Sequence, residues 1–269
     1  MNIYREKYEA QTGKVVSKHA QQLEPLFTKI AADELLPPKG QQAVDLGFTA
    51  HCLNDPHEDP EVYQYYQWVL TNCFENKSKR ELSAKLIGAT FTAANIFKTD
   101  LPQPITLNPW QIEKIRDFPL ATTHAIIVEN NGVFIWLLQR HPDWPLINQA
   151  GNDFNSAYLA VVKSLEQRQV KLAYIGDLDS RGIQMADYLF SQLTMTAIET
   201  FTAIQSPSRV IEWLIKFGKD SVKRSRKLQI VNSMLQQEQD SVHVLKCFVE
   251  QEQLIVAYER LIPAWLKQY

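Results

Sequence analysis

The stretch YIGDLDSRGIQMADYL, Tyr174–Leu189, decides the fold of the chain. An apolar run ends at Gly176, two aspartates follow with one residue between them, and a helical pattern begins near Gly182. This order predicts a strand, a tight turn and a helix, with Asp177 and Asp179 at the junction. Ligands bind beyond the carboxyl ends of parallel strands, and alternate residues of an extended chain point the same way. We therefore expect both carboxylates to reach one Mg²⁺ or Mn²⁺ ion.

The segments around this stretch alternate between strand and helix patterns. Strands are expected at residues 124–129, 146–150, 172–176 and 196–202, and helices at residues 131–140, 153–167 and 181–192. Short connections in a β-α-β order favour an α/β fold with a mostly parallel, Rossmann-like sheet that is flanked by helices.

Acidic residues end two of the expected strands at the same edge of this sheet. Glu129 ends the first strand, Gly151 the second, and Asp177 with Asp179 the third. Carboxylates are the hard oxygen donors that Mg²⁺ prefers, and without a cation they would repel one another. Gly151 would let a phosphate come close to the backbone. The alternative is that Asp179 only caps the following helix, but the joint pattern favours a metal site.

Composition excludes several classes of protein. The 269 residues are 45% hydrophobic and 22% charged, with a net charge of -2, which is typical of a globular protein with one or two domains. Three distant cysteines offer no disulfide framework, which favours the cytoplasm. The polar N-terminus lacks a signal-peptide pattern, and no run of about 18 uncharged apolar residues predicts a membrane span.

The N-terminal region, residues 1–98, is expected to form a mainly helical domain. Helices are predicted within residues 1–36 and 61–74, with a loop at 45–60 whose His51, Cys52 and His57 are a generic alternative metal set. A further helix is expected from Ser78, because Ser78 and Glu81 have capping-box spacing. Basic residues near this junction would suit a helix-turn-helix or winged-helix DNA contact, or a solvated rim of a packing domain: Lys77, Lys79, Arg80 and Lys85.

The remaining chain divides at proline-rich and basic segments. Residues 99–120 are expected to be a linker or arm, 121–206 the catalytic α/β domain, and 207–269 a helical extension packed on it. The extension carries a basic run that either follows a DNA backbone or is a solvated face. The DNA-contact candidates from this run are Lys223, Arg224, Arg226 and Lys227, and Arg181 beside the acids is a further one.

Three motifs resemble the Toprim domain of topoisomerases, primases and nucleases. IIVENNGVFIWLL resembles its Glu-bearing segment, and YIGDLDSRGIQMA its Asp-x-Asp-x-x-Gly segment, in the manner of the topoisomerase VI A subunit. NQAGNDFNSAYLAVVKSL stands where those proteins have a glycine-led helix. Asn130, Gly176 and the element Glu250-Gln251-Glu252 are similar to the JetD family of Wadjet plasmid-defence systems.

The resemblance implies a metal-dependent DNA endonuclease of a defence system against plasmids or phages. Glu129, Asp177 and Asp179 would bind Mg²⁺ or Mn²⁺, with Glu252 as a candidate fourth ligand. The expected partners are DNA and an SMC-type ATPase complex, a homodimer is a further candidate, and no membrane is expected. Two alternatives stay open. One is a topoisomerase VI A-like subunit that attacks with a tyrosine such as Tyr63, Tyr65 or Tyr66. The other is a non-catalytic Toprim subunit that binds DNA or a protein.

Overall fold

The computed structural model describes residues 3–74, 79–82, 91–150 and 154–267. The chain divides into two compact units, Met1–Ala84 and Lys85–Tyr269. Each unit has its own hydrophobic core. None of the described helices is long and apolar enough to cross a membrane.

The first unit is helical, as its apolar spacing predicts. Its aromatic stripe forms the core, since Tyr65 and Tyr66 of the longest helix are fully buried and Phe27 packs against both rings. Asp59 caps this helix by accepting a hydrogen bond from the N–H of Val62 at 3.1 Å. The helices are α1 (Ile3–Thr12), η1 (Ala20–Leu23), α2 (Glu24–Ala31), α3 (Lys39–Asp45) and α4 (Pro60–Cys73).

The prediction of a helix from Ser78 is wrong for residues 79–82. Ser78 lies outside the described residues, and residues 79–82 are extended and pair with Leu36. Leu36 N–H donates to the Arg80 carbonyl at 2.7 Å, and Leu82 N–H donates to the Leu36 carbonyl at 2.9 Å. Glu81 accepts from Gln42 at 2.9 Å. Backbone pairing with a distant segment therefore overrides the local capping signal.

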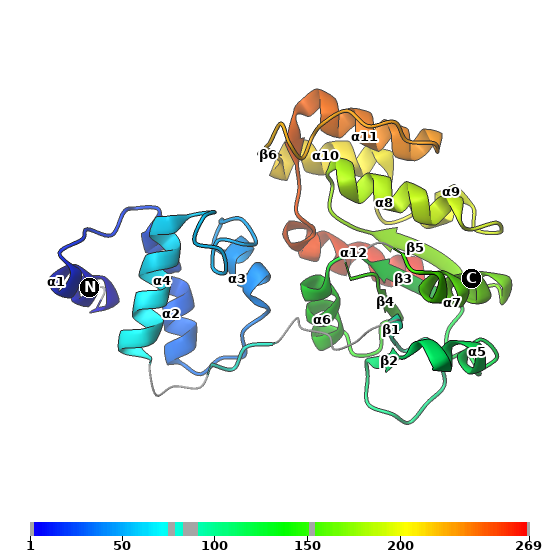
Figure 1. Ribbon diagram of the computed structural model, residues 1–269, viewed down its shortest axis with the longest axis horizontal. Coiled ribbons are helices and arrows are strands. Elements are labelled where there is room, and N and C mark those ends of the chain that lie inside the picture. The colour runs from blue at the N-terminus through cyan, green and yellow to red at the C-terminus, as the bar shows by residue number, and fades with distance from the viewer. Residues whose placement is uncertain (1–2, 75–78, 83–90, 151–153, 268–269) are drawn as a thin grey trace. The chain divides into compact units, whose positions relative to one another are not determined.

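The second unit is built on a five-stranded mixed sheet in the order β2-β1-β4-β3-β5 (Figure 1). The strands are β1 (Phe91–Ala94), β2 (Ile105–Leu107), β3 (His124–Val128), β4 (Leu146–Asn148) and β5 (Lys171–Ile175). β4, β3 and β5 are parallel, as predicted, and β1 is antiparallel to β4 and β2. β1 lies in the N-terminal region 1–98 that is expected to be mainly helical, and β2 lies in the expected linker, so the sheet reaches further toward the N-terminus than the sequence pattern indicates.

The strand expected at residues 196–202 is instead a short helix, α9 (Ile198–Phe201). Its Phe201 ring stacks on Tyr174 of β5 with centroids 5.5 Å apart, and Thr202 Oγ1 donates to the Ile198 carbonyl at 2.9 Å. β5 is consequently the edge of the sheet, and α9 packs beside it.

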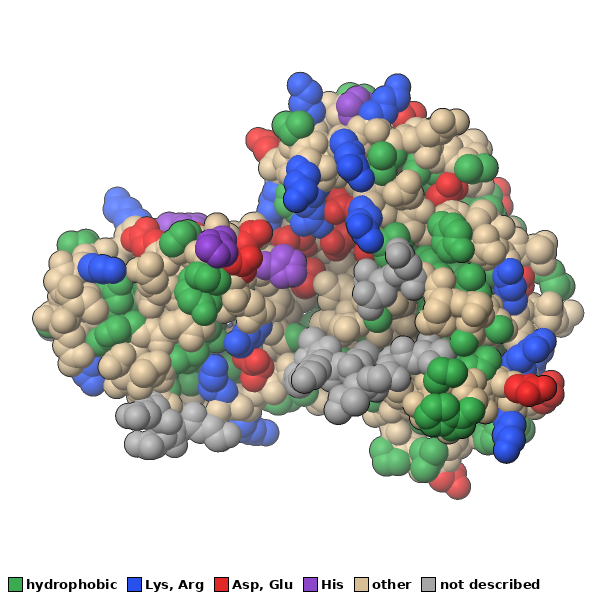
Figure 2. All heavy atoms as spheres, viewed as in Figure 1, with side chains coloured by type: hydrophobic (Ala, Val, Ile, Leu, Met, Phe, Trp, Pro, Cys, Tyr) green, Lys and Arg blue, Asp and Glu red, His purple; other side chains and the backbone are tan. Residues whose placement is uncertain are grey.

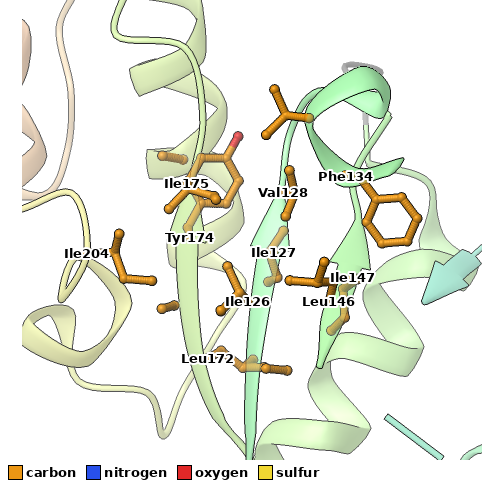
Figure 3. Packing of buried hydrophobic residues seen from close by; sticks show 14 of the residues in the cluster. Ile126, Ile127, Val128, Phe134, Leu146, Ile147, Leu172, Tyr174, Ile175 and Ile204 are labelled. Carbon is orange, nitrogen blue, oxygen red and sulfur yellow. The ribbon is translucent and has the colours of Figure 1, made fainter. Parts of the chain in front are cut away.

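Three strands of near-continuous apolar sequence form the centre of the core. All five residues of β3 are buried, which is expected for a parallel strand covered on both faces. Figure 3 shows Ile126, Ile127 and Val128 of β3 between side chains of β4 and β5. This packing fixes where each strand ends, and so where the acidic residues stand.

Polar side chains cap several helices of the second unit. Asn130, Asn155 and Asp179 each accept N–H groups of the first turn of the helix that follows. The described α-helices besides α9 are α5 (Ile112–Ile115), α6 (Asn131–Arg140), α7 (Ser156–Gln167), α8 (Ser180–Ser191), α10 (Pro207–Phe217), α11 (Ser233–Leu245) and α12 (Ile255–Leu266). Most of the described residues after 206 are therefore helical. This C-terminal segment also contains a two-stranded ribbon, β6 (Lys219–Asp220) with β7 (Cys247–Phe248).

Glu166 anchors the loop that follows α8. Its carboxylate accepts N–H groups of Thr194, Met195 and Thr196 at 2.7–3.0 Å. Burial would raise the pKa of Glu166, but these donors outweigh burial and lower it. The charged form is therefore the one that the fold stabilises.

We expect Glu166→Gln to lower the free energy of unfolding by about 2 kcal/mol at neutral pH, since hydrogen bonds to a charged acceptor contribute about 1.5–3 kcal/mol. A lowered folded pKa stabilises the protein above the unfolded pKa of roughly 4.3, and this contribution is lost as the pH falls through the folded pKa. Urea unfolding of both proteins from about pH 3 to about pH 8 measures the difference. A difference that stays constant down to about pH 3 would contradict the prediction.

Candidate functional site

The carboxyl ends of β3 and β5 bring two of the predicted acidic residues together. Val128 pairs with Ile175 at the end of the two parallel strands, and Glu129 N–H donates to the Ile175 carbonyl at 3.1 Å. Two residues after Ile175, the Asp177 N–H donates to Glu129 Oε2 at 3.1 Å. Glu129 and Asp177, 48 positions apart in the chain, are therefore in direct contact.

Asp177 and Asp179 each fix one carboxylate oxygen on backbone N–H groups. Asp179 Oδ1 accepts from Arg181 and Gly182 at 3.0 and 2.8 Å, so this residue does cap α8. Asp177 Oδ1 accepts from Gln251 N–H at 2.8 Å. The Oδ2 atom of each aspartate remains for another partner. The capping role and the site role of Asp179 are thus compatible, because they use different oxygens.

Two glycines make room for this arrangement. A Cβ atom on Gly176 would lie 2.3 Å from Glu129 Oε2, and one on Gly182 would lie 2.3 Å from the Asp177 carbonyl oxygen. Gly176 is also held on both sides by Gln205, which accepts its N–H at 2.5 Å and donates to its carbonyl at 3.0 Å. The glycines of the Gly-Asp-x-Asp-x-x-Gly pattern are therefore required by contact distances at the acids.

The C-terminal segment completes the cluster with two more glutamates. Leu178 and Val249 form a β-bridge with hydrogen bonds of 2.9 and 3.1 Å, which places residues 250–252 beside the aspartates. Asn130 donates from its backbone N–H to Gln251 at 3.0 Å and from its side chain to Glu252 at 2.9 Å. Glu250 and Glu252 are both buried. The element Glu250-Gln251-Glu252 thus touches both acidic strand ends.

Arg224 lies among these acids and bonds three of them. Its guanidinium donates to Asp179 Oδ2 at 2.7 Å, to Asp177 Oδ2 at 2.8 Å and to Glu250 Oε1 at 3.4 Å. The group also stacks on the Phe248 ring, with 3.9 Å from Cζ to the ring centroid. Lys219 adds a second cation by pairing with Glu250 at 3.0 Å. The basic run in the sequence predicts Arg224 only as a DNA contact, and neither Lys219 nor Glu250 is predicted as a bonding partner.

The other DNA-contact candidates have different surroundings. Lys223, Arg226 and Lys227 are exposed on the loop between β6 and α11. Figure 2 shows Lys and Arg side chains gathered over the α10–α11 part of this unit, next to a group of acidic ones. Arg181 is exposed on the first turn of α8, and Gly151 lies outside the described residues. Contact of these exposed residues with DNA stays a prediction.

The acids in this cluster lack sufficient positive charge. Burial, followed by repulsion from Asp177 and Asp179, raises the pKa of Glu129 to about 8. Burial and then Asp177 raise the pKa of Glu252 to about 8. Burial raises the pKa of Asp177 to about 6 although Arg224 opposes this. Five carboxyl groups share two cationic side chains, Arg224 and Lys219.

The donor atoms of this set, carboxylate oxygens, are of the kind that a hard divalent cation prefers. The guanidinium of Arg224 stands where two of those oxygens converge, and so acts as a stand-in cation. Within the described ranges, no three His, Cys, Asp or Glu side chains are grouped as metal ligands. Neither the acids at the strand ends nor His51, Cys52 and His57 form such a group in the described structure.

Comparison with known proteins gives one match, which covers part of the second unit. Residues 105–202 match a family described as "Protein of unknown function C-terminus (DUF2399)". The match contains Glu129, Asp177 and Asp179 and stops before Arg224 and the Glu250–Glu252 element. No match was found among curated proteins or among solved structures.

We expect Gly176→Ala to lower the free energy of unfolding by about 1–3 kcal/mol, because the added methyl group collides with the Glu129 carboxylate. Combining it with Glu129→Asp, which shortens that side chain by one methylene group, is expected to recover part of the loss. Chemical denaturation of the wild type, both single variants and the double variant measures the coupling. Simply additive losses would show that Glu129 does not occupy the space above Gly176.

Proposed function

We propose that the protein is a metal-dependent DNA endonuclease of the Toprim type, which hydrolyses phosphodiester bonds with Mg²⁺ or Mn²⁺. The observation that carries this proposal is the pair of Oδ2 atoms of Asp177 and Asp179, which converge on one cationic group while their Oδ1 atoms are held by the backbone. A bound divalent cation would neutralise charge on the phosphoryl oxygens and lower the pKa of an attacking water.

Neighbouring residues hold the proposed ligand side chains in fixed orientations at a partly buried site. Glu129 is oriented by two donors, the Asp177 N–H at 3.1 Å and the Tyr174 hydroxyl at 3.3 Å. Glu252 is oriented by Asn130, whose Oδ1 atom in turn caps α6. Each proposed ligand is thus positioned by a second group, as is usual for functional metal sites. Glu129, Asp177 and Asp179 would hold the cation, and Glu252 stands beside them.

A groove along α8, the helix that Asp179 caps, supports a nucleic acid as the substrate. It has a volume of about 480 Å³ and is lined by Phe154, Arg181, Gln184, Met185 and Tyr188. The four α8 residues follow the i, i+3, i+4, i+7 spacing of one helix face, which begins at the Asp179 cap. Tyr188 is half exposed and stacks on Phe154 with centroids 5.9 Å apart. The aromatic rings of this groove are suited to stack on bases, and the positive charge of Arg181 is suited to attract phosphates.

Four buried tyrosines are poor candidates for a nucleophile, whereas Tyr63 is partly exposed and Tyr188 is half exposed. Tyr65 and Tyr66 are fully buried, and burial raises the pKa of both hydroxyl groups. Tyr174 and Tyr258 lie near the acids, but they too are buried, and burial raises their pKa well above the ordinary value. A nucleophilic tyrosine would need exposure to DNA and activation, and these four have neither.

A role in defence against plasmids or phages is part of this proposal. The DUF2399 family is associated with JetD proteins of Wadjet systems, and this supports an SMC-type ATPase complex as the partner. The second candidate function is a non-catalytic Toprim subunit that binds DNA. The ion pairs of Arg224 favour it, because an arginine that fills the acid cluster permanently would leave no place for a cation.

Plasmid cleavage tests the proposal. With Mg²⁺ or Mn²⁺, alone or with SMC-type partner subunits, the wild type is expected to nick or linearise supercoiled DNA. We expect Asp177→Asn to reduce the rate by about 100-fold or more, because it removes a charge from the site but keeps the shape of the side chain. Asp117→Asn, the same change at an exposed position of this unit, is the matched control.

Equal products from the wild type and Asp177→Asn in every setting would contradict hydrolysis at this site. A protein–DNA adduct that survives denaturation would instead identify a tyrosine nucleophile. DNA binding without cleavage in all settings would favour the non-catalytic subunit.

A further inference from the structure

Arg224 uses every nitrogen of its guanidinium within the acid cluster. Nε, Nη2 and Nη1 bond Asp179, Asp177 and Glu250 in turn. The two short bonds go to the Oδ2 atoms, which are the oxygens that no backbone group holds in the described structure. The fork geometry of arginine suits such a pair of carboxylates, whereas a lysine would act as a single point charge.

We infer that Arg224 is an internal counter-ion that competes with a divalent cation for Asp177 and Asp179. This inference rests on the proposed metal site. Without the cation, Arg224 holds the two carboxylates together against their repulsion. A cation held by Asp177 and Asp179 would compete with the guanidinium for these carboxylates, so its binding would weaken or break the two ion pairs of Arg224.

The surroundings of Arg224 allow its side chain to move while its backbone stays in place. The Arg224 carbonyl accepts the Ser180 N–H at 2.8 Å, and the Arg226 carbonyl accepts the Ser180 hydroxyl at 2.6 Å. These bonds tie the loop to the start of α8. A guanidinium released from the aspartates would keep Glu250 and the face of Phe248 as partners. It would then stand beside the cation with donors free for a phosphate oxygen.

Charge explains which cations this arrangement would admit. A monovalent ion brings no more charge than the guanidinium that it displaces, and it gives up the directional bonds that the fork makes. A divalent ion doubles the charge facing Asp177 and Asp179, and the Coulomb attraction grows in proportion. Arg224 would therefore lower the affinity for every metal ion and select divalent ions over monovalent ones.

Calorimetric titration of the full chain with MnCl₂ tests the inference. We expect Arg224→Gln to bind Mn²⁺ about tenfold more tightly than the wild type or better, and Arg224→Lys to fall between them. Lys219→Gln is the matched control, because it removes one positive charge that pairs with Glu250. Its Mn²⁺ affinity is expected to change less than that of Arg224→Gln.

A second measurement separates competition from mere support of the fold. Without metal, Arg224→Gln is expected to melt at a lower temperature than the wild type, because the carboxylates lose their counter-ion. The rise in melting temperature on adding saturating Mn²⁺ is expected to be larger in this variant. If Arg224→Gln does not fold, Arg224→Lys carries the same comparison.

The Mn²⁺ titrations distinguish a failure of the inference from a failure of the proposed metal site. Equal or weaker Mn²⁺ binding in a folded Arg224 variant, with binding in the wild type, overturns the inference and leaves the proposed metal site standing. No Mn²⁺ binding in the wild type, Arg224→Gln and Lys219→Gln overturns the inference together with the metal-dependent function.

Discussion

Repulsion among buried carboxylates constrains how the second unit is built around its acidic cluster. Glu129, Asp177 and Asp179 meet at two adjacent strand ends, and Glu250 and Glu252 approach them from the C-terminal segment. Isolated charges in such a place are costly unless they are paired and hydrogen-bonded. The neighbouring structure supplies backbone N–H groups, the Asn130 amide and the Arg224 guanidinium, and each lies on a different element. The carboxylates of the cluster are therefore held by groups from several different elements.

Hydrogen bonds and ion pairs of this cluster connect the C-terminal extension with the strand ends of the sheet. The loop that carries Arg224 and the segment that carries Glu252 come from outside the family match at residues 105–202. The core of the sheet thus provides the acids, while the extension provides the groups that balance or complete them. On the proposed function, the extension would set how strongly the site binds its cation, and the exposed lysines and Arg226 would set how it meets DNA.

Much of the second unit could be predicted from local sequence, because its signals are strong there. β3 and β5 are apolar runs, and α6 and α8 begin at Asn130 and Asp179, which are good caps. The predicted contact between Glu129 and Asp177 followed from the rule that parallel strands end at one edge.

The remainder depended on contacts between distant residues. β1 and β2 have only four and three residues, too short for a periodic pattern. Residues 196–202 contain β-branched residues that suggest a strand, yet Glu166 and Tyr174 fix that segment as a loop and a helix. Arg224 is one of several cations in a basic run, and only the fold shows that it reaches acids 45 and 47 positions away.

The central claim is that the strand-end acids form a divalent-cation site. Anomalous diffraction from crystals of the protein grown with Mn²⁺ tests it most directly. The account predicts a peak within bonding distance of the Oδ2 atoms of Asp177 and Asp179, near Glu129, with the Arg224 guanidinium displaced from both aspartates. Crystals at saturating Mn²⁺ that show no peak there, with Arg224 still bonded to both aspartates, would contradict it.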